Sequence, residues 1–227
     1  MLAATACSST GQKRASSEPS AEPVSDAGWR IRGDRLRRDV DGDGVPDLVA
    51  IEDRGKRSCR YRLAVWTKRG LFAAPLQFPN CPFPPRVAGL AAIDREQGLE
   101  IVIRAGTGGV TELAGIWKVV GGSIAQFRLP DSTEGLLTFS GGPGHSSRLD
   151  CVSSEPGEVV WSFFHRERPP SKGEAAPYEV TRTFYRAVGG DLVFVRVERL
   201  DFERRSAIRV PEWREPQPFP SCMRVRA

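Results

Sequence analysis

The stretch Asp39-Val-Asp-Gly-Asp-Gly-Val-Pro-Asp47, with Leu48-Val-Ala-Ile51 directly after it, decides how this chain folds. It places carboxylates at positions 1, 3, 5 and 9 of a short loop, and an apolar run rich in strand-forming residues follows. Short apolar runs bounded by turn residues are typical of β-strands. We therefore expect a strand to leave the loop. Elsewhere the chain offers no convincing long amphipathic helix.

The same order of features occurs three times along the chain. An Asp closes one strand, an acid opens an apolar strand, and an alternating strand leads into a glycine turn. These markers are Asp39, Asp47 and Gly70, then Asp94, Glu100 and Gly121, then Asp150, Glu158 and Gly189. A steady period of this length indicates repeated supersecondary units, and glycine turns suit hairpins. The sequence therefore predicts an all-β fold of three repeated four-stranded antiparallel units.

Units of this size have the dimensions of propeller blades. Three blades are few, so a partial or small propeller, a three-unit stack and a sandwich-like closure all stay open. We expect a flexible tether over residues 1–28 and one β domain over 29–227, with units at about 29–80, 84–130 and 136–200. In the closing tail, 201–227, we expect Ala207–Val210 to add a strand to the first unit and Cys222 to lock it there.

The acidic loop has the composition of a calcium site. Calcium takes six to eight oxygen ligands, and alternate residues of a tight loop can aim their oxygens at one centre. The predicted ligands are the carboxylates of Asp39, Asp41, Asp43 and Asp47 and the carbonyl of Val45. An EF-hand is excluded because its twelfth position, which needs Glu, is Ala50 here. The alternative is an acidic turn neutralised by nearby arginines, namely Arg35, Arg37 and Arg38.

We predict one metal site rather than three. Matched from its first Asp, the loop Asp94–Glu100 is two residues shorter than the first and contains Arg95. The loop Asp150–Glu158 lacks acids at its third and fifth positions.

Residues 39–51 resemble the signature of the FG-GAP/VCBS repeat family, the integrin-α-like propeller blades. That signature is D-x-D-G-D-G-x-x-D followed by an apolar strand, and the rest of the chain matches only through its repeat pattern. The resemblance implies that the loop joins two strands of a blade and binds calcium. It also implies a surface or secreted binding module, since most members are of that kind.

The N-terminus and the cysteines indicate an exported protein. Met1–Ser9 looks like the end of a bacterial lipoprotein signal peptide, in which Cys7 would become the lipidated residue. Four cysteines then remain for two disulfides. Of three possible connectivities we favour Cys59–Cys81 and Cys151–Cys222; buried free thiols are the alternative.

The function expected from these features is an exported, lipid-anchored or secreted module at the outer face of the cell membrane. It would bind a protein or a cell-wall polymer, with Ca2+ as its cofactor. No catalytic residues are predicted. The alternative is an extracellular hydrolase of glycans or esters that uses the acid pairs Asp94/Glu100 or Asp150/Glu158. A nucleic-acid partner is not expected, because the arginines behind the net charge of +5 are scattered along the chain.

Overall fold

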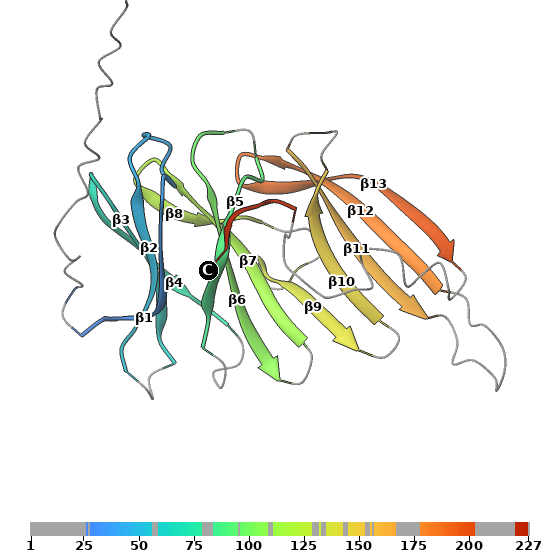
Figure 1. Cartoon of the computed structure of the whole chain (residues 1–227), viewed down its shortest axis with the longest axis horizontal. Helices are drawn as coiled ribbons and strands as arrows, with labels where there is room; N and C mark the ends of the chain where they lie inside the picture. Colours follow the sequence, from blue (N-terminus) through green and yellow to red (C-terminus); the bar gives the residue numbers. More distant parts are fainter. Residues whose placement is uncertain are drawn as a thin grey trace, which may run out of the picture.

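The fold consists of β-strands throughout the described part of the chain. The structure is a computed structural model that describes residues 26, 28–55, 59–78, 84–94, 96–108, 111–128, 132, 135–142, 145–152, 155, 157–166, 178–202 and 221–226. The predicted all-β class is confirmed, and the sheets form a blade-like arrangement without a closed barrel (Figure 1). Within the described residues, no helix is long and apolar enough to span a membrane.

The first unit is a four-stranded antiparallel sheet in the order β1-β2-β3-β4. Its strands are β1 (Arg30–Arg38), β2 (Asp47–Asp53), β3 (Tyr61–Thr67) and β4 (Gly70–Leu76). All seven residues of β2 are buried, because this apolar strand lies between two others and under a second sheet. The acidic loop therefore joins β1 to the central strand of a sheet, as the apolar run after it predicts.

The second unit repeats this meander and forms the middle layer of the molecule. Its strands are β5 (Arg86–Ala91), β6 (Glu100–Gly108), β7 (Thr111–Val120) and β8 (Ser123–Gln126). Alternate residues of β6 enter different cores. Ile101 and Ile103 pack toward the first unit, while Val102 packs toward the third. A strand that is buried on both faces needs an unbroken apolar run, which explains Glu100-Ile-Val-Ile103.

The third unit extends from the second through one added strand. Its own strands are β10 (His145–Cys151), β11 (Glu158–Arg166), β12 (Tyr178–Val188) and β13 (Asp191–Phe202). The added strand β9 (Leu137–Gly142) pairs with both β7 and β10. This added strand has no counterpart in the predicted repeat.

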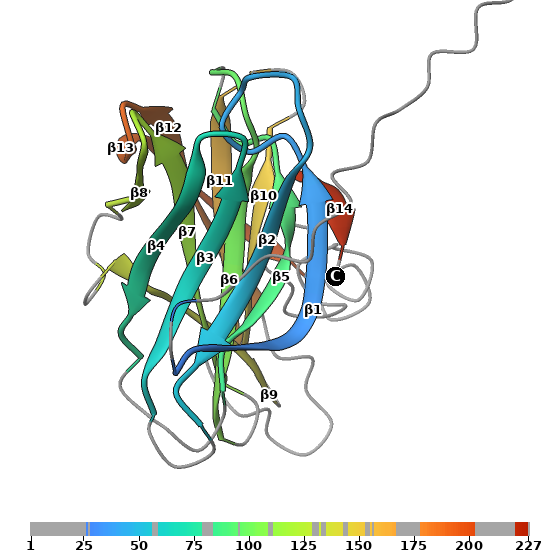
Figure 2. The same ribbon diagram turned by 90° about the vertical axis from the view of Figure 1, so that its left-hand side faces the viewer.

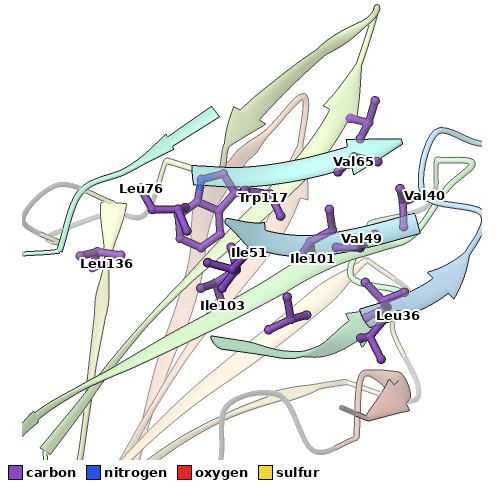
Figure 3. Packing of buried hydrophobic residues seen from close by; sticks show 14 residues of the cluster. Leu36, Val40, Val49, Ile51, Val65, Leu76, Ile101, Ile103, Trp117 and Leu136 are labelled. Atoms are coloured by element: carbon purple, nitrogen blue, oxygen red, sulfur yellow. The ribbon is translucent and has the colours of Figure 1, made fainter. Parts of the chain in front are cut away.

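Two apolar clusters hold the three units together. The cluster between the first and second units contains Leu36, Val49, Val65, Ile101 and Trp117, which come from both sheets (Figure 3). The cluster between the second and third units is built around Phe127, Phe139 and Leu149. The first unit therefore packs face to face on the second, whereas the third continues the sheet of the second through β9.

The C-terminal tail differs from the prediction. The strand β14 (Met223–Arg226) pairs with β5 of the second unit, not with the first unit. The reason is the position of Cys222, which is bonded to Cys151 at the end of β10, while its carbonyl accepts a hydrogen bond from the amide of Ala92. The disulfide and this hydrogen bond together place the tail beside β5. The predicted strand Ala207–Val210 lies outside the described residues.

Candidate metal centre

The acidic loop curls around the carboxylate of Asp39. Asp39 Oδ1 accepts a hydrogen bond from the Gly42 amide at 2.7 Å, and Oδ2 accepts one from the Gly44 amide at 2.8 Å. Both glycines have positive φ, +79° and +80°, which residues with a side chain rarely adopt. The two glycines of the motif therefore permit the curl that brings the later acids back toward Asp39.

Three of the predicted ligands meet inside this curl. Carboxylate oxygens of Asp39, Asp41 and Asp43 lie within 4.8 Å of one another. The side chains of Asp41 and Asp43 are only 3% and 7% exposed. Their other oxygens are used within the loop, since Asp41 Oδ1 accepts from the Asp43 amide and Asp43 Oδ1 accepts from the Val45 amide. Three negative groups this close repel one another unless a cation lies among them.

Asp47 holds the start of the loop through hydrogen bonds but lies outside this group of three. It opens β2, is 1% exposed, and its Oδ2 accepts hydrogen bonds from the amides of Val40 and Asp41. Its Oδ1 is buried and makes no hydrogen bond within the described part of the chain. Burial, together with the charges of Asp41 and Asp43, raises the pKa of Asp47 to about 6. The fifth predicted ligand, the carbonyl of Val45, stays a prediction.

Two side chains from the β3–β4 turn approach the loop. Lys68 Nζ lies 2.8 Å from Asp43 Oδ2, and Arg69 Nε lies 3.8 Å from Asp41 Oδ2. The hydrogen bond from Lys68 is the main reason that the pKa of Asp43 is lowered. Both cations are about half exposed, so water screens their attraction for the loop. Of the arginines in the predicted alternative, Arg38 donates a hydrogen bond to the backbone carbonyl of Arg37.

The loop of the second unit follows the same plan residue by residue. The amide of Ile93 donates to Glu100 seven positions later, as the amide of Val40 donates to Asp47. The Glu96 amide donates to Asp94 Oδ1, just as the Asp43 amide donates to Asp41 Oδ1. The counterparts of the first loop's last three acids are therefore Asp94, Glu96 and Glu100. The expectation of a loop two residues shorter was wrong, because the residue matching Asp39 is Ala92.

A buried lysine of β7, Lys118, reaches the acids of the second loop. The side chain of Lys118 is 4% exposed, and its Nζ lies 2.5 Å from Asp94, 2.8 Å from Glu96 and 3.5 Å from Glu100. The pKa of Lys118 is raised by these carboxylates in spite of its burial. Burial raises the pKa of Glu100 to about 7. This cluster is a closed ion-pair network with an internal cation.

The third unit has two arginines beside its buried acid, and both are about half exposed. Glu158 is 3% exposed and lies 2.5 Å from Arg186 and 3.2 Å from Arg196. Asp150 pairs with Arg148 and accepts a hydrogen bond from the Ser221 amide. The acids proposed for hydrolysis are therefore committed to ion pairs in both of these units.

The strand register shows that these cations occupy one position of the repeat. Leu48 lies opposite Trp66, and Ile101 lies opposite Trp117. In the third unit Val159 lies opposite Tyr185, and the neighbouring pair is Glu158 and Arg186. The residue after the aromatic thus meets the buried acid in the second and third units, and the register of the first unit, continued by one residue, places Thr67 opposite Asp47. In chain order this residue is Thr67, Lys118 and Arg186.

The sequence interpretation did not identify this position, although the signal is present in the sequence. Each alternating strand carries an aromatic residue followed by Thr, Lys or Arg before its glycine turn. Thr67 is the one uncharged member of the three, and it belongs to the unit with the most acidic loop. The first unit therefore lacks the built-in counter-ion that the other two possess at this position.

The first and second loops also touch. A Cβ on Gly42 would lie 2.7 Å from Gln97 Cβ, and one on Gly98 would lie 2.7 Å from the carbonyl oxygen of Val40. Backbone of one loop thus packs directly on the other at the same end of the stacked sheets (Figure 2). The shape of either loop limits the shape of its neighbour.

The cysteines agree with the predicted scheme where the structure describes them. Cys151 and Cys222 form a disulfide, as predicted. Cys59 lies within the described part, whereas Cys81 and the predicted lipidation site Cys7 do not. The pairing of Cys59 with Cys81 therefore stays a prediction.

Comparison of the chain with protein-family models, with curated proteins and with solved structures finds no match.

Proposed function

We propose that the loop Asp39–Asp47 binds one calcium ion that fastens the end of β1 to the start of β2. The ligands would be the carboxylates of Asp39, Asp41, Asp43 and Asp47 with the carbonyl of Val45, as in the FG-GAP/VCBS repeats that the motif resembles. A hard divalent ion suits this donor set, because every donor is an oxygen. The ion would supply positive charge and structural rigidity rather than chemistry.

The observation that carries this proposal is the contrast within the chain itself. Two units place a lysine or an arginine against their buried acid, at 3.5 Å in the second unit and 2.5 Å in the third. The first unit has Thr67 at that position and a buried Asp47 oxygen without a hydrogen-bond partner in the described residues. Glu100 Oε1 also lacks a hydrogen bond within the described residues, but Lys118 lies 3.5 Å from it. A buried carboxylate oxygen with neither a hydrogen bond nor a neighbouring cation is costly, so Asp47 Oδ1 calls for a cation from outside.

We propose further that the protein is an exported, lipid-anchored binding or structural module and not an enzyme. The Cys151–Cys222 disulfide supports export, because such bonds persist in oxidising compartments. The ion pairs around Glu100 and Glu158 support a structural role for those acids. The partner would be a protein or a cell-wall polymer at the outer face of the cell membrane.

The tether would leave the domain at the end opposite the metal loop. Trp29 lies under the guanidinium groups of Arg54 and Arg62, and Asp26 pairs with Arg62 at 2.7 Å. From there β1, which bends at the irregularity between Arg32 and Leu36, runs to the loop along β2, so that its ends pair with Asp53 and Asp47 at the two ends of β2 (Figure 2).

A thermal unfolding experiment tests the calcium proposal. A ligand present at 100 times its Kd adds about 2.7 kcal/mol. In a domain of this size that corresponds to a rise in Tm of roughly 5–10 °C. We expect EDTA to remove this rise in the wild type, and Asp41→Asn to abolish it. The matched control is Asp34→Asn, an exposed acid in β1, which should keep the full response. Equal midpoints in calcium and in EDTA for the wild type would refute the proposal.

A further inference from the structure

We propose that Lys118 is a built-in cation that occupies, in the second unit, the site that a metal ion takes in the first. The residue that follows the aromatic of the third strand would then decide whether a unit depends on metal. This inference rests on the proposed calcium site, and it assigns a selector position to Thr67 and its counterparts.

The acids around Lys118 are the structural counterparts of three predicted metal ligands. Asp94, Glu96 and Glu100 match Asp41, Asp43 and Asp47 in their amide hydrogen bonds, and Glu100 also matches Asp47 in opening the second strand. One oxygen from each of them lies within 3.5 Å of a single point, and that point is the ammonium nitrogen. The second loop is therefore a cation site of the same plan whose occupant belongs to the chain.

The burial of Lys118 shows that the loop is built around the charge. Its side chain is 4% exposed, whereas Lys68, which reaches the first loop from a turn, is 54% exposed. A lysine is rarely buried to this extent without paired charges. Its three carboxylates include two that are themselves almost fully buried, at 5% and 0% exposure. Lys68, by contrast, is a surface side chain that an incoming ion can displace.

The proposal also explains why the acids differ between the two loops. The first loop has a fourth carboxylate, Asp39, where the second has Ala92. A monovalent ammonium group needs fewer negative charges around it than a divalent ion does. The second unit thus differs from the first by two linked changes: Ala92 replaces the acid, and Lys118 supplies the positive charge.

The test moves the cation into the first unit. Thr67→Lys should place an ammonium group opposite Asp47, and Thr67→Met is the matched control with a long uncharged side chain. Calcium is titrated calorimetrically into metal-stripped full-length protein of each variant. We expect Thr67→Met to bind one calcium ion per chain and Thr67→Lys to bind at least about 10-fold more weakly. The Tm of Thr67→Lys in EDTA should also exceed that of Thr67→Met.

Equal calcium affinity in the two variants would overturn the selector role. If Thr67→Lys does not fold, the reverse exchange decides. The double variant Ala92→Asp with Lys118→Thr should acquire a second site for Tb3+, detected through luminescence sensitised by the neighbouring Trp117, and a single site in that variant would overturn the inference. Absence of calcium binding by the wild type is a different result, because it refutes the calcium proposal itself.

Discussion

Replacing Lys118 by Met should destabilise the protein strongly. The change keeps an unbranched side chain of similar length but removes the charge that lies 2.5 Å from Asp94 and 3.5 Å from Glu100. Removing one partner of a buried ion pair typically costs about 3–5 kcal/mol, because the other partner stays buried and unpaired. For a chain of this length, that loss corresponds to a fall in Tm of roughly 6–20 °C.

The pH dependence of this loss has a definite sign. The pKa of Glu100 is already raised to about 7 by burial, and loss of the ammonium group raises it further. An acid whose folded pKa lies above its unfolded value loses stability as the pH rises above the unfolded value, here 4.5. The difference between Lys118→Met and wild type should therefore be small near pH 4.5 and grow toward pH 8.

Differential scanning calorimetry in EDTA, from pH 4.5 to pH 8, measures this effect. The control is Lys68→Met, because Lys68 pairs with Asp43 at 2.8 Å but is 54% exposed. Such surface pairs contribute at most about 1 kcal/mol. A midpoint for Lys118→Met within about 3 °C of the wild type at pH 7 would refute the reasoning, since that shift corresponds to about 1 kcal/mol.

Two further predictions concern contacts near the loops. Gly98→Ala should lower Tm by several degrees more than the control Gly33→Ala in calorimetry. Both glycines have positive φ, but only a Cβ on residue 98 would lie 2.7 Å from the carbonyl oxygen of Val40. Equal losses of Tm in the two variants would argue against tight packing between the loops. Glu158→Gln should lower Tm at pH 7, because the hydrogen bond from Arg186 lowers the pKa of Glu158. A carboxyl group whose pKa is lowered by folding stabilises the fold at pH values above its unfolded pKa, here 4.5. The Tm difference between Glu158→Gln and wild type should therefore close as the pH falls below 4.5. A Tm difference that does not change with pH would contradict the ion-pair explanation.

The strands and their grouping were predictable because the signals are local. Alternation of polar and apolar residues, the Gly70, Gly121 and Gly189 turns and the short apolar strands all depend on neighbours along the chain. The curl of the first loop was predictable for the same reason, since Asp39 bonds to amides only three and five residues ahead. Three of the five expected ligand residues are gathered by these local bonds.

Features that depend on distant pairing were not predictable. The second loop was misread because its register is set by Ala91 opposite Glu100, a contact that the spacing of acids does not reveal. Lys118 reads as one more polar residue of an alternating strand, and only the fold brings it to acids more than fifteen positions away. The tail strand β14 follows the Cys151–Cys222 bond, which joins residues 71 positions apart.

The most direct test of the central claim is a calorimetric titration of calcium into metal-stripped wild-type protein, with Asp41→Asn and Asp34→Asn in parallel. The first loop alone combines a full set of acids with an uncharged residue at the selector position. We therefore predict one bound calcium ion per chain for the wild type and for Asp34→Asn, and none for Asp41→Asn. Absence of binding to the wild type, or unchanged binding to Asp41→Asn, would contradict the assignment of this loop as a calcium site.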